Sequence, residues 1–272
     1  MNRSTTGISK GFTLIELLVV IAIIALLLSI LMPSLQLAKD QVKRVGCSVN
    51  LRSLATAAIL YAEENDGHTP CSTVEWNSGP GPGWVGRTCM QSSGEALPVE
   101  EQITAIQNGQ LYKYIENTKG WRCPSDPDRE QMRSYGMAAQ WWGNYITSDN
   151  SISYDPAAPS DIVYRKISNI KLPSQRFLFM DSQGKMRDGY FALWYSEFLW
   201  WNIPNFNHGG GSVNGFADGH VLYYKLGPET IENAKIGLES GGFGMPQDSP
   251  QTQKGIDDLR CYQRATWGTA AQ

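Results

Sequence analysis

The sequence is poor in charge and in histidine. Of its 272 residues, 18% are Asp, Glu, Lys or Arg and 3 are His, whereas globular chains average about 25% charged residues. The 23 basic residues do not outnumber the 26 acidic ones, which argues against a protein that binds nucleic acid through excess positive charge. Hydrophobic residues make up 42% of the chain, too many for an extended disordered polyelectrolyte.

The sequence also lacks the short motifs that mark common catalytic sites. It has no G-x-S-x-G, no H-E-x-x-H and no phosphate-binding loop. A Ser-His-Asp arrangement would have to use His68, His208 or His220. Asp181 and Asp218 could imitate the carboxylate pair of a sugar hydrolase, but almost any domain offers two such residues. We therefore predict that the protein is not an enzyme.

The apolar residues gather near the N-terminus. Between Phe12 and Met32 the polar residues are Thr13, Glu16 and Ser29 alone. As a helix this segment would be ~30 Å long, the thickness of the hydrocarbon core of a bilayer. A buried core helix is the alternative, but such helices rarely remain apolar on every face over their whole length. We predict a membrane-spanning helix.

The segment has the features of a retained anchor. It is longer than the ~7–15 apolar residues of a secretory signal peptide, and no A-x-A-like cleavage site follows it. Its orientation cannot be read from charge, because basic residues flank it on both sides. These are Arg3 and Lys10 before it and Lys39, Lys43 and Arg44 after it.

Glu16 is the one charged residue inside the apolar span. A carboxylate there costs about 2.5–3.5 kcal/mol on insertion, so it points by default to a function. The alternative is that Glu16 reaches the membrane interface, since it lies only four residues past Phe12.

The stretch KGFTLIE, which ends at Glu16, resembles the processing site of type IV pilins and type II secretion pseudopilins. The resemblance implies that prepilin peptidase removes a leader of residues 1–11 by cutting between Gly11 and Phe12 on the cytoplasmic face. It implies that Phe12 is N-methylated and that Glu16 pairs with an amino terminus during filament assembly. The N-terminus would then be cytoplasmic, residues 12–33 would cross the inner membrane once, and the remainder would be periplasmic or extracellular.

A second helical part, residues 34–66, is amphipathic and is expected to pack on a globular head of residues 67–272. Asn65-Asp66-Gly67 is a strong signal for the end of the helix, and a coiled coil would need a longer and more regular stripe. The apolar stripe consists of Leu35, Ala38, Val42, Val45 and Val49, and then of Leu51, Leu54, Ala58 and Tyr61.

The head is expected to be α+β, with a small antiparallel sheet lying on the long helix. Residues 103–117 predict a short helix broken at Asn108-Gly109. Strands are predicted within 176–181, 190–194 and 212–226. Residues 68–100 and 126–161 are rich in Gly, Pro, Ser or Asp and are expected to form loops.

Near the C-terminus, nine residues separate His208 from Asp218-Gly219. This spacing resembles the H-x9-DG motif of a large subgroup of pilin-like proteins, many of them similar to the G protein of type II secretion. We expect Asp218-Gly219 to form a hairpin turn and the His208–Asp218 pair to fix the neighbouring loop. A transition-metal site would use His208, Asp218 and His220, with Asp181 as a further candidate ligand. No cofactor is predicted. The alternative is Ca2+, which would draw on oxygen donors without EF-hand spacing, namely Asp126, Asp128, Asp248, Asp257 and Asp258.

The five cysteines and two tryptophan pairs leave alternatives open. No two cysteines form a C-x-x-C, which argues against zinc. Outside the cytoplasm disulfides are permitted; the candidate pairs are Cys71 with Cys89 and Cys47 with Cys123, with Cys261 left over, and free buried thiols are the alternative. Trp141-Trp142 and Trp200-Trp201 either present exposed rings for sugar or protein binding or complete a core.

The sequence therefore favours a pilin-like structural subunit of a type II secretion pseudopilus or a type IV pilus-like filament. Its expected partners are prepilin peptidase, other pilin or pseudopilin subunits, the inner-membrane secretion platform and membrane lipid, and not nucleic acid. The alternative is a membrane-anchored binding protein that uses a pilin-type anchor, with carbohydrate as a candidate ligand.

Overall fold

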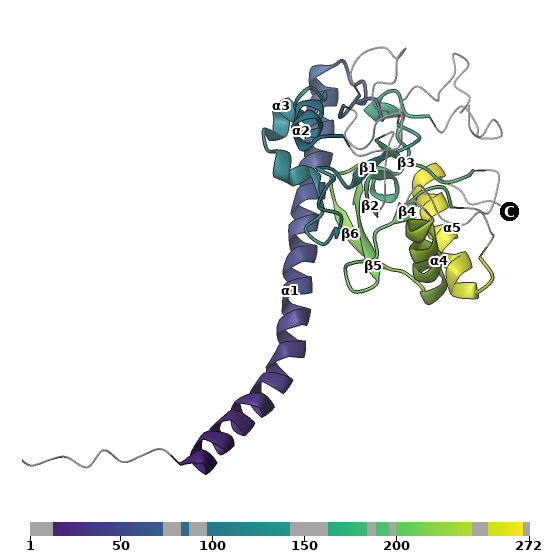
Figure 1. Cartoon of the computed structure of the whole chain (residues 1–272). Helices are drawn as coiled ribbons and strands as arrows, with labels where there is room; N and C mark the ends of the chain where they lie inside the picture. Colours follow the sequence, from purple (N-terminus) through teal and green to yellow (C-terminus); the bar gives the residue numbers. More distant parts are fainter. Residues whose placement is uncertain are drawn as a thin grey trace, which may run out of the picture. The chain divides into compact units, whose positions relative to one another are not determined.

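A computed structural model describes residues 13–72, 83–86, 97–141, 163–183, 189–195, 200–240 and 250–268 (Figure 1). The chain divides into two compact units, Met1–Val42 and Lys43–Gln272. They are described in turn.

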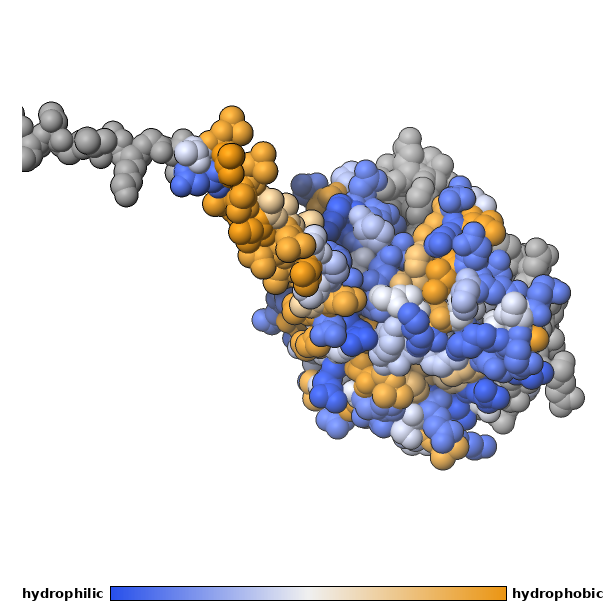
Figure 2. Space-filling view, turned by 90° about the horizontal axis from the view of Figure 1, so that it is seen from below, coloured by the Kyte–Doolittle hydropathy of each residue, from blue (hydrophilic) through white to orange (hydrophobic). Residues whose placement is uncertain are grey.

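The first unit consists of the N-terminal part of α1 (Leu14–Glu64), a continuous helix that passes through Pro33. This confirms the predicted long helix. Its large apolar side chains are exposed, and Figure 2 shows them as an orange surface along the helix. In the described part of the chain, α1 is the one helix long and apolar enough to cross a membrane, and none of that apolar stretch is buried.

In the second unit, α1 packs its C-terminal part into the core of the head. The buried residues of α1 are Cys47, Leu51, Leu54, Ala55, Ala57, Ala58 and Ala62. The predicted stripe is thus right from Leu51 onward and wrong before it, because Val45 and Val49 are 62% and 58% exposed. The reason is helical geometry: Val45 lies two residues before Cys47, about 200° around the helix from the buried face.

The helix ends where the sequence predicted. Asp66 and Gly67 both take positive φ angles, 54° and 78°, and the Gly67 N–H donates to the Ala62 carbonyl at 2.8 Å. This left-handed ending satisfies a carbonyl that the helix itself leaves without a partner.

The head is built on a mixed sheet with the strand order β3-β1-β2-β5-β6, and β4 pairs with β2. All pairs are antiparallel except β1 with β3, which is parallel. The strands are β1 (Tyr135–Ala138), β2 (Phe177–Gln183), β3 (Tyr190–Phe191), β4 (Ile203–Pro204), β5 (Gly211–Phe216) and β6 (Val221–Lys225). The α+β class is confirmed, with β1 lying inside the segment 126–161 that was expected to be a loop.

The central strands are buried on both faces because helices cover each side. On β5, the Cα of Gly215 faces Leu51 of α1, with space for no more than a methyl group. Its neighbour Asn214 points the opposite way and donates to the Tyr262 hydroxyl at 3.0 Å. Tyr262 belongs to α5 (Gln253–Trp267). The sheet therefore lies between α1 and α5.

Helices α4 (Pro228–Glu239) and α5 were not predicted. Asp258 of α5 links them, because its Oδ2 accepts from the Gly227 N–H at 2.6 Å and from Thr230 Oγ1 at 2.7 Å. The carboxylate thereby caps the N-terminus of α4, where negative charge is favourable.

The remaining helices are short. The expected break at Asn108-Gly109 is confirmed, since it separates α2 (Val99–Gln107) from α3 (Tyr112–Ile115). The 3-10 turns among the described residues are η1 (Thr118–Trp121), η3 (Ile167–Asn169) and η4 (Pro173–Gln175).

Tryptophan rings fill much of the core. Trp84 and Trp121 stack with ring centroids 5.3 Å apart, and Trp141 and Trp200 are both only 2% exposed. These two rings therefore belong to the core rather than to an exposed sugar platform. Trp142 lies outside the described residues.

Candidate functional site

The first candidate site is the start of α1. The backbone N–H and the hydroxyl of Thr13 both donate to Glu16 Oε2 at 2.8 Å. In return, the Glu16 N–H donates to Thr13 Oγ1 at 3.2 Å. This reciprocal arrangement is a capping box, which satisfies N–H groups at the beginning of a helix. Sequence reasoning missed it, although the T-x-x-E spacing is its usual signal.

The capping box gives Glu16 a local structural role beside the predicted assembly role. Gly11 and Phe12, the predicted cleavage residues, lie outside the described residues, so cleavage and methylation stay predictions. Following Glu16, the exposed apolar surface of α1 runs from Leu17 to Met32. Such a surface is unfavourable in water and marks contact with lipid or with other helices.

The second candidate site is the region around His208, where the structure changes the predicted pairing. Gly219 has φ 88° and its N–H donates to the Phe216 carbonyl at 2.9 Å, so the predicted turn after β5 is confirmed. The His208–Asp218 pair is wrong. His208 Nε2 lies 2.9 Å from Asp181 Oδ2, and Asp218 instead pairs with His220 within the exposed turn.

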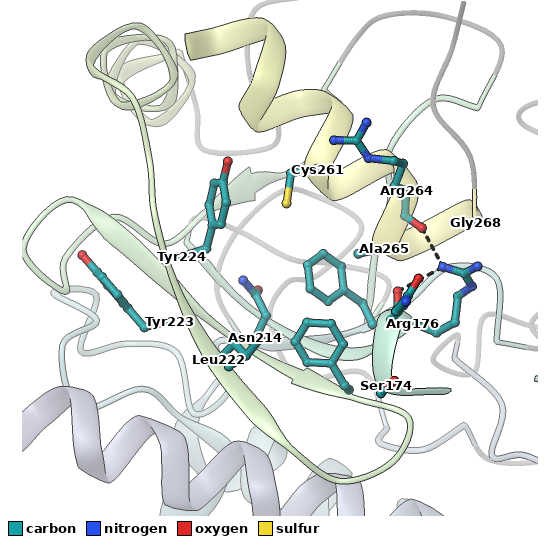
Figure 3. Close-up of a pocket in the computed structure, with 13 residues that line it drawn as sticks. Ser174, Arg176, Asn214, Leu222, Tyr223, Tyr224, Cys261, Arg264, Ala265 and Gly268 are labelled. Atoms are coloured by element: carbon teal, nitrogen blue, oxygen red, sulfur yellow. Dashed lines mark hydrogen bonds between the residues drawn. The ribbon is translucent and has the colours of Figure 1, made fainter. Parts of the chain in front are cut away.

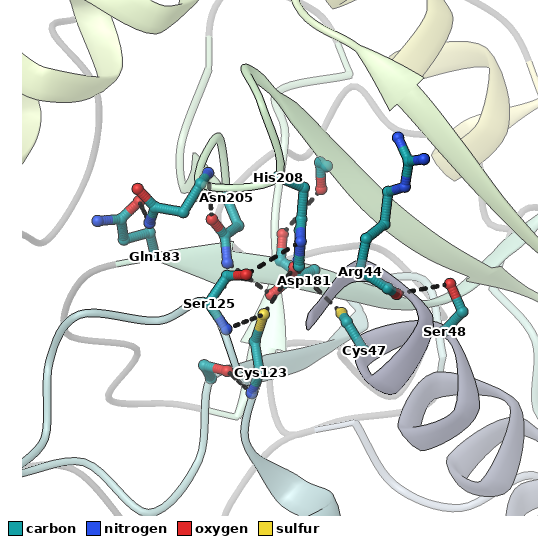
Figure 4. A network of polar contacts seen from close by, with 12 residues as sticks. Arg44, Cys47, Ser48, Cys123, Ser125, Asp181, Gln183, Asn205 and His208 are labelled. Carbon is teal, nitrogen blue, oxygen red and sulfur yellow. Dashed lines mark hydrogen bonds and ion pairs between the residues drawn. The ribbon is translucent and has the colours of Figure 1, made fainter. Parts of the chain in front are cut away.

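Four side chains from distant parts of the sequence converge around His208 (Figure 4). Cys47 comes from α1, Cys123 follows η1, Asp181 lies on β2 and His208 precedes β5. One donor atom from each lies within 4.8 Å of all the others. All four residues are at most 3% exposed. We call them the Cys47–His208 cluster.

The contacts inside this cluster are short. Cys47 Sγ donates to Asp181 Oδ2 at 3.3 Å, and Cys123 Sγ lies 3.1 Å from His208 Nε2. Burial opposes protonation of His208, but its hydrogen bonds to Asp181 and Cys123 outweigh burial and raise its pKa to about 9. Burial raises the pKa of the Cys47 thiol well above its usual value, and the neighbouring Cys123 and Asp181 add to this.

The cluster bears on the proposed disulfides. Cys47 and Cys123 do come together, as their suggested pairing required, but as free thiols. Cys71 is buried, and Cys89 lies outside the described residues, so that second pairing stays a prediction. Cys261, half-buried on α5, is also a free thiol.

Among the described residues, the other predicted metal ligands form no further group of three or more, although Asp218 and His220 lie against each other in the turn. In the described part of the chain, the Cys47–His208 cluster is the only group of three or more potential ligands. Asp126 Oδ1 and Asp128 Oδ1 each accept a backbone N–H two residues ahead at 3.0 Å. Asp257 accepts from Gln253 at 2.9 Å, and Asp248 lies outside the described residues.

A pocket of about 350 Å³ lies between the sheet and α5 (Figure 3). The surface that lines it is more apolar than polar and includes the rings of Phe177, Phe216 and Tyr224. The Arg176 guanidinium donates to the Arg264 carbonyl at 2.9 Å, so its position is fixed by the protein itself.

Comparisons with known proteins bear on the N-terminal part of the chain. Residues 8–32 match the family described as the prokaryotic N-terminal methylation motif. The chain is 30% identical over 90 residues to a ComG operon protein 3 homolog of Bacillus licheniformis, covering 33% of this chain and 89% of the relative. It is 39% identical over 61 residues to the type IV wide pilus major component PilA4 of Thermus thermophilus, covering 22% of this chain and 47% of that protein. No solved structure matches.

Proposed function

Because the chain belongs to the family of type IV pilin-like proteins, we propose that it is a structural subunit that assembles into a filament through α1. The observation that carries the proposal is the apolar N-terminal part of α1, none of which is buried in the single chain. In a membrane this surface contacts lipid, and in a filament it contacts the same segment of neighbouring subunits. Transfer from lipid to a helix bundle keeps the apolar residues out of water at both stages.

The proposal includes processing before assembly. Prepilin peptidase removes residues 1–11, and Phe12 becomes the methylated N-terminus. The methylation motif over residues 8–32 supports both steps. The anchor then crosses the inner membrane once, with its N-terminus at the cytoplasmic face and the head on the other side. Neither relative's name describes an enzyme, and we propose a purely structural role.

We assign the assembly contact to Glu16, whose carboxylate is paired with the new N-terminus of an adjacent subunit. An isolated carboxylate in an apolar bundle is costly, and a partner of opposite charge offsets much of that cost. The capping box supports this because it holds the carboxylate at the beginning of the helix, close to the chain end that cleavage would create.

The capping box also supplies the test. A Gln can take the place of Glu in a capping box, so Glu16→Gln keeps the cap and removes the charge, whereas Glu16→Ala removes both. We expect both variants to be cleaved and membrane-anchored but absent from filaments, as measured by mass spectrometry of the N-terminus and by immunoblotting of sheared filaments. Filaments containing Glu16→Gln at the wild-type level would contradict the charge pairing.

The machine that assembles the filament is the finer part of the proposal. The H-x9-DG spacing and the resemblance to G-like pseudopilins favour a type II secretion pseudopilus with its inner-membrane platform, and the pilus relative favours a type IV pilus. Deleting the gene and measuring secreted enzymes and surface filaments in parallel separates the two. A protein that remains membrane-bound, forms no filament and retains a ligand in both Glu16 variants would instead be an anchored binding protein.

A further inference from the structure

We propose that the Cys47–His208 cluster is a structural binding site for one zinc-class divalent ion, held by two cysteine sulfurs, an imidazole nitrogen and a carboxylate oxygen. The inference is independent of filament assembly. Sequence spacing argued against zinc because no C-x-x-C is present. The fold supplies what the spacing lacks, since it brings the two cysteines together from α1 and from the segment after η1.

The donor types select the class of ion. Thiolate and imidazole ligands favour zinc over calcium or magnesium, which prefer oxygen. Four protein donors complete a tetrahedral site without water, as in structural rather than catalytic zinc sites. Cys47 and Asp181 are 0% exposed and His208 is 3% exposed, so the described cluster is closed to solvent in the same way.

The distances are close to those a tetrahedral ion requires. With metal–ligand bonds of ~2.0–2.3 Å, neighbouring donor atoms in a tetrahedron lie ~3.3–3.8 Å apart. In the structure, Cys47 Sγ to Asp181 Oδ2 is 3.3 Å, Cys123 Sγ to His208 Nε2 is 3.1 Å, and His208 Nε2 to Asp181 Oδ2 is 2.9 Å. To admit the ion, these three separations would widen by about a few tenths of an ångström, and the donor pairs that lie up to 4.8 Å apart would close by up to about 1 Å, both through side-chain rotation.

Each of the four residues also has a hydrogen-bond partner behind it. His208 Nδ1 lies 3.2 Å from Ser125 Oγ, which leaves Nε2 free to bind a metal when Nδ1 carries the proton. Asp181 Oδ1 accepts from Asn205 Nδ2 at 3.0 Å. Partners of this kind orient the ligands of zinc sites and fix the histidine tautomer.

The two sulfurs have their own donors. The Tyr135 hydroxyl donates to Cys47 Sγ at 3.4 Å, and the Ser125 N–H donates to Cys123 Sγ at 3.4 Å. Donors aimed at sulfur stabilise a thiolate, the form that binds a metal. A plain hydrophobic core has no need of such donors around a cysteine.

Such an ion would join four segments that otherwise meet here through packing and hydrogen bonds. Cys47 lies in the part of α1 that the head buries, and the other three ligands belong to the head. Because the site does not exist in the unfolded chain, binding would stabilise the folded head and its attachment to α1.

The test uses the full-length chain, extracted in detergent without chelator and under reducing conditions. We expect about one zinc per chain by elemental analysis. After removal of the metal, Co2+ should bind in equal amount and give a near-ultraviolet thiolate-to-cobalt band with the visible bands of a tetrahedral ion. Cys123→Ser should lose or strongly weaken both, while the control Cys261→Ser should retain them, because Cys261 lies on α5 outside the cluster.

Three results would overturn the proposal. The first is a reduced, natively folded wild-type chain that contains no metal and takes up no cobalt, with folding judged by near-ultraviolet circular dichroism. The second is a Cys47–Cys123 disulfide in the purified chain, seen as a cross-linked peptide lighter by two hydrogens. The third is Cys123→Ser that retains one ion with an unchanged spectrum. If that variant fails to fold, the wild-type cobalt measurement alone decides.

Discussion

The two ends of α1 differ in how much of their apolar surface the single chain buries. Between Leu17 and Met32 the helix exposes apolar side chains on every face, whereas from Cys47 to Ala62 it presents one buried face made mostly of alanine and leucine. In the head, by contrast, the most deeply buried groups include Asp181 and His208, which are polar and paired. The first unit needs lipid or other helices to complete it, while the head satisfies its polar groups internally. One continuous helix can form both parts because the backbone stays helical and only the side chains on its surface differ.

The largest effect should come from breaking the buried polar pair. Asp181→Ala leaves His208 without its partner inside the core, which costs about 3–5 kcal/mol for a buried pair. Asp218→Ala is the matched control, since Asp218 belongs to the exposed turn and its pair with His220 is worth well under 1 kcal/mol. Chemical unfolding followed by tryptophan fluorescence measures both. Equal effects of the two variants would contradict the assignment of the stabilising pair to Asp181.

A second experiment compares the same substitution in the two parts of α1. Ile23 and Val45 are 52% and 62% exposed, so neither side chain is buried in the single chain. If residues 12–33 span the membrane, Ile23→Lys costs about 2.5–3.5 kcal/mol on insertion, and much of the protein should leave the membrane fraction. Val45→Lys should remain membrane-bound and change stability by no more than about 0.5 kcal/mol. If both variants stayed in the membrane fraction at wild-type levels, the result would contradict a membrane-spanning role for residues 12–33 alone.

The last expected effect is a change in the stability of the head with pH, which is small over any single pH unit. Burial is the main cause that raises the pKa of Asp126 from 3.8 to about 7. Between these values the folded chain holds a proton that the unfolded chain releases, so stability falls as pH rises, by up to about 1.4 kcal/mol per pH unit. Asp126→Asn should flatten this slope. Unfolding curves of both proteins between about pH 4 and pH 7 provide the measurement, and parallel slopes would refute the assignment.

The sequence predicted the elements whose signals are local. The apolar run to Met32, the stop at Asn65-Asp66-Gly67 and the break at Asn108-Gly109 each depend on neighbouring residues. Strand β1 was missed because it lies in a segment rich in turn-forming residues, and α4 and α5 were missed because their mean polarity hides a narrow apolar face.

Of the two candidate sites, one has a local sequence signal and the other is formed by residues far apart in the sequence. Glu16 could be recognised from the sequence because it is a charge within an apolar run. Its capping box could have been recognised from the T-x-x-E spacing. The Cys47–His208 cluster could not, since its members are separated by dozens of residues and meet only when β2 and α1 are in place. Sequence spacing instead paired His208 with Asp218, its nearest motif partner.

The buried face of α1 also determines how the head would respond to force. Residues 47–62 contact the core along ~22 Å of helix, at ~1.5 Å per residue. A pull along the axis of this part of α1 loads these contacts in shear and nearly all at once instead of peeling them apart one by one. The buried face of α1 therefore resists an axial force by shear rather than by peeling.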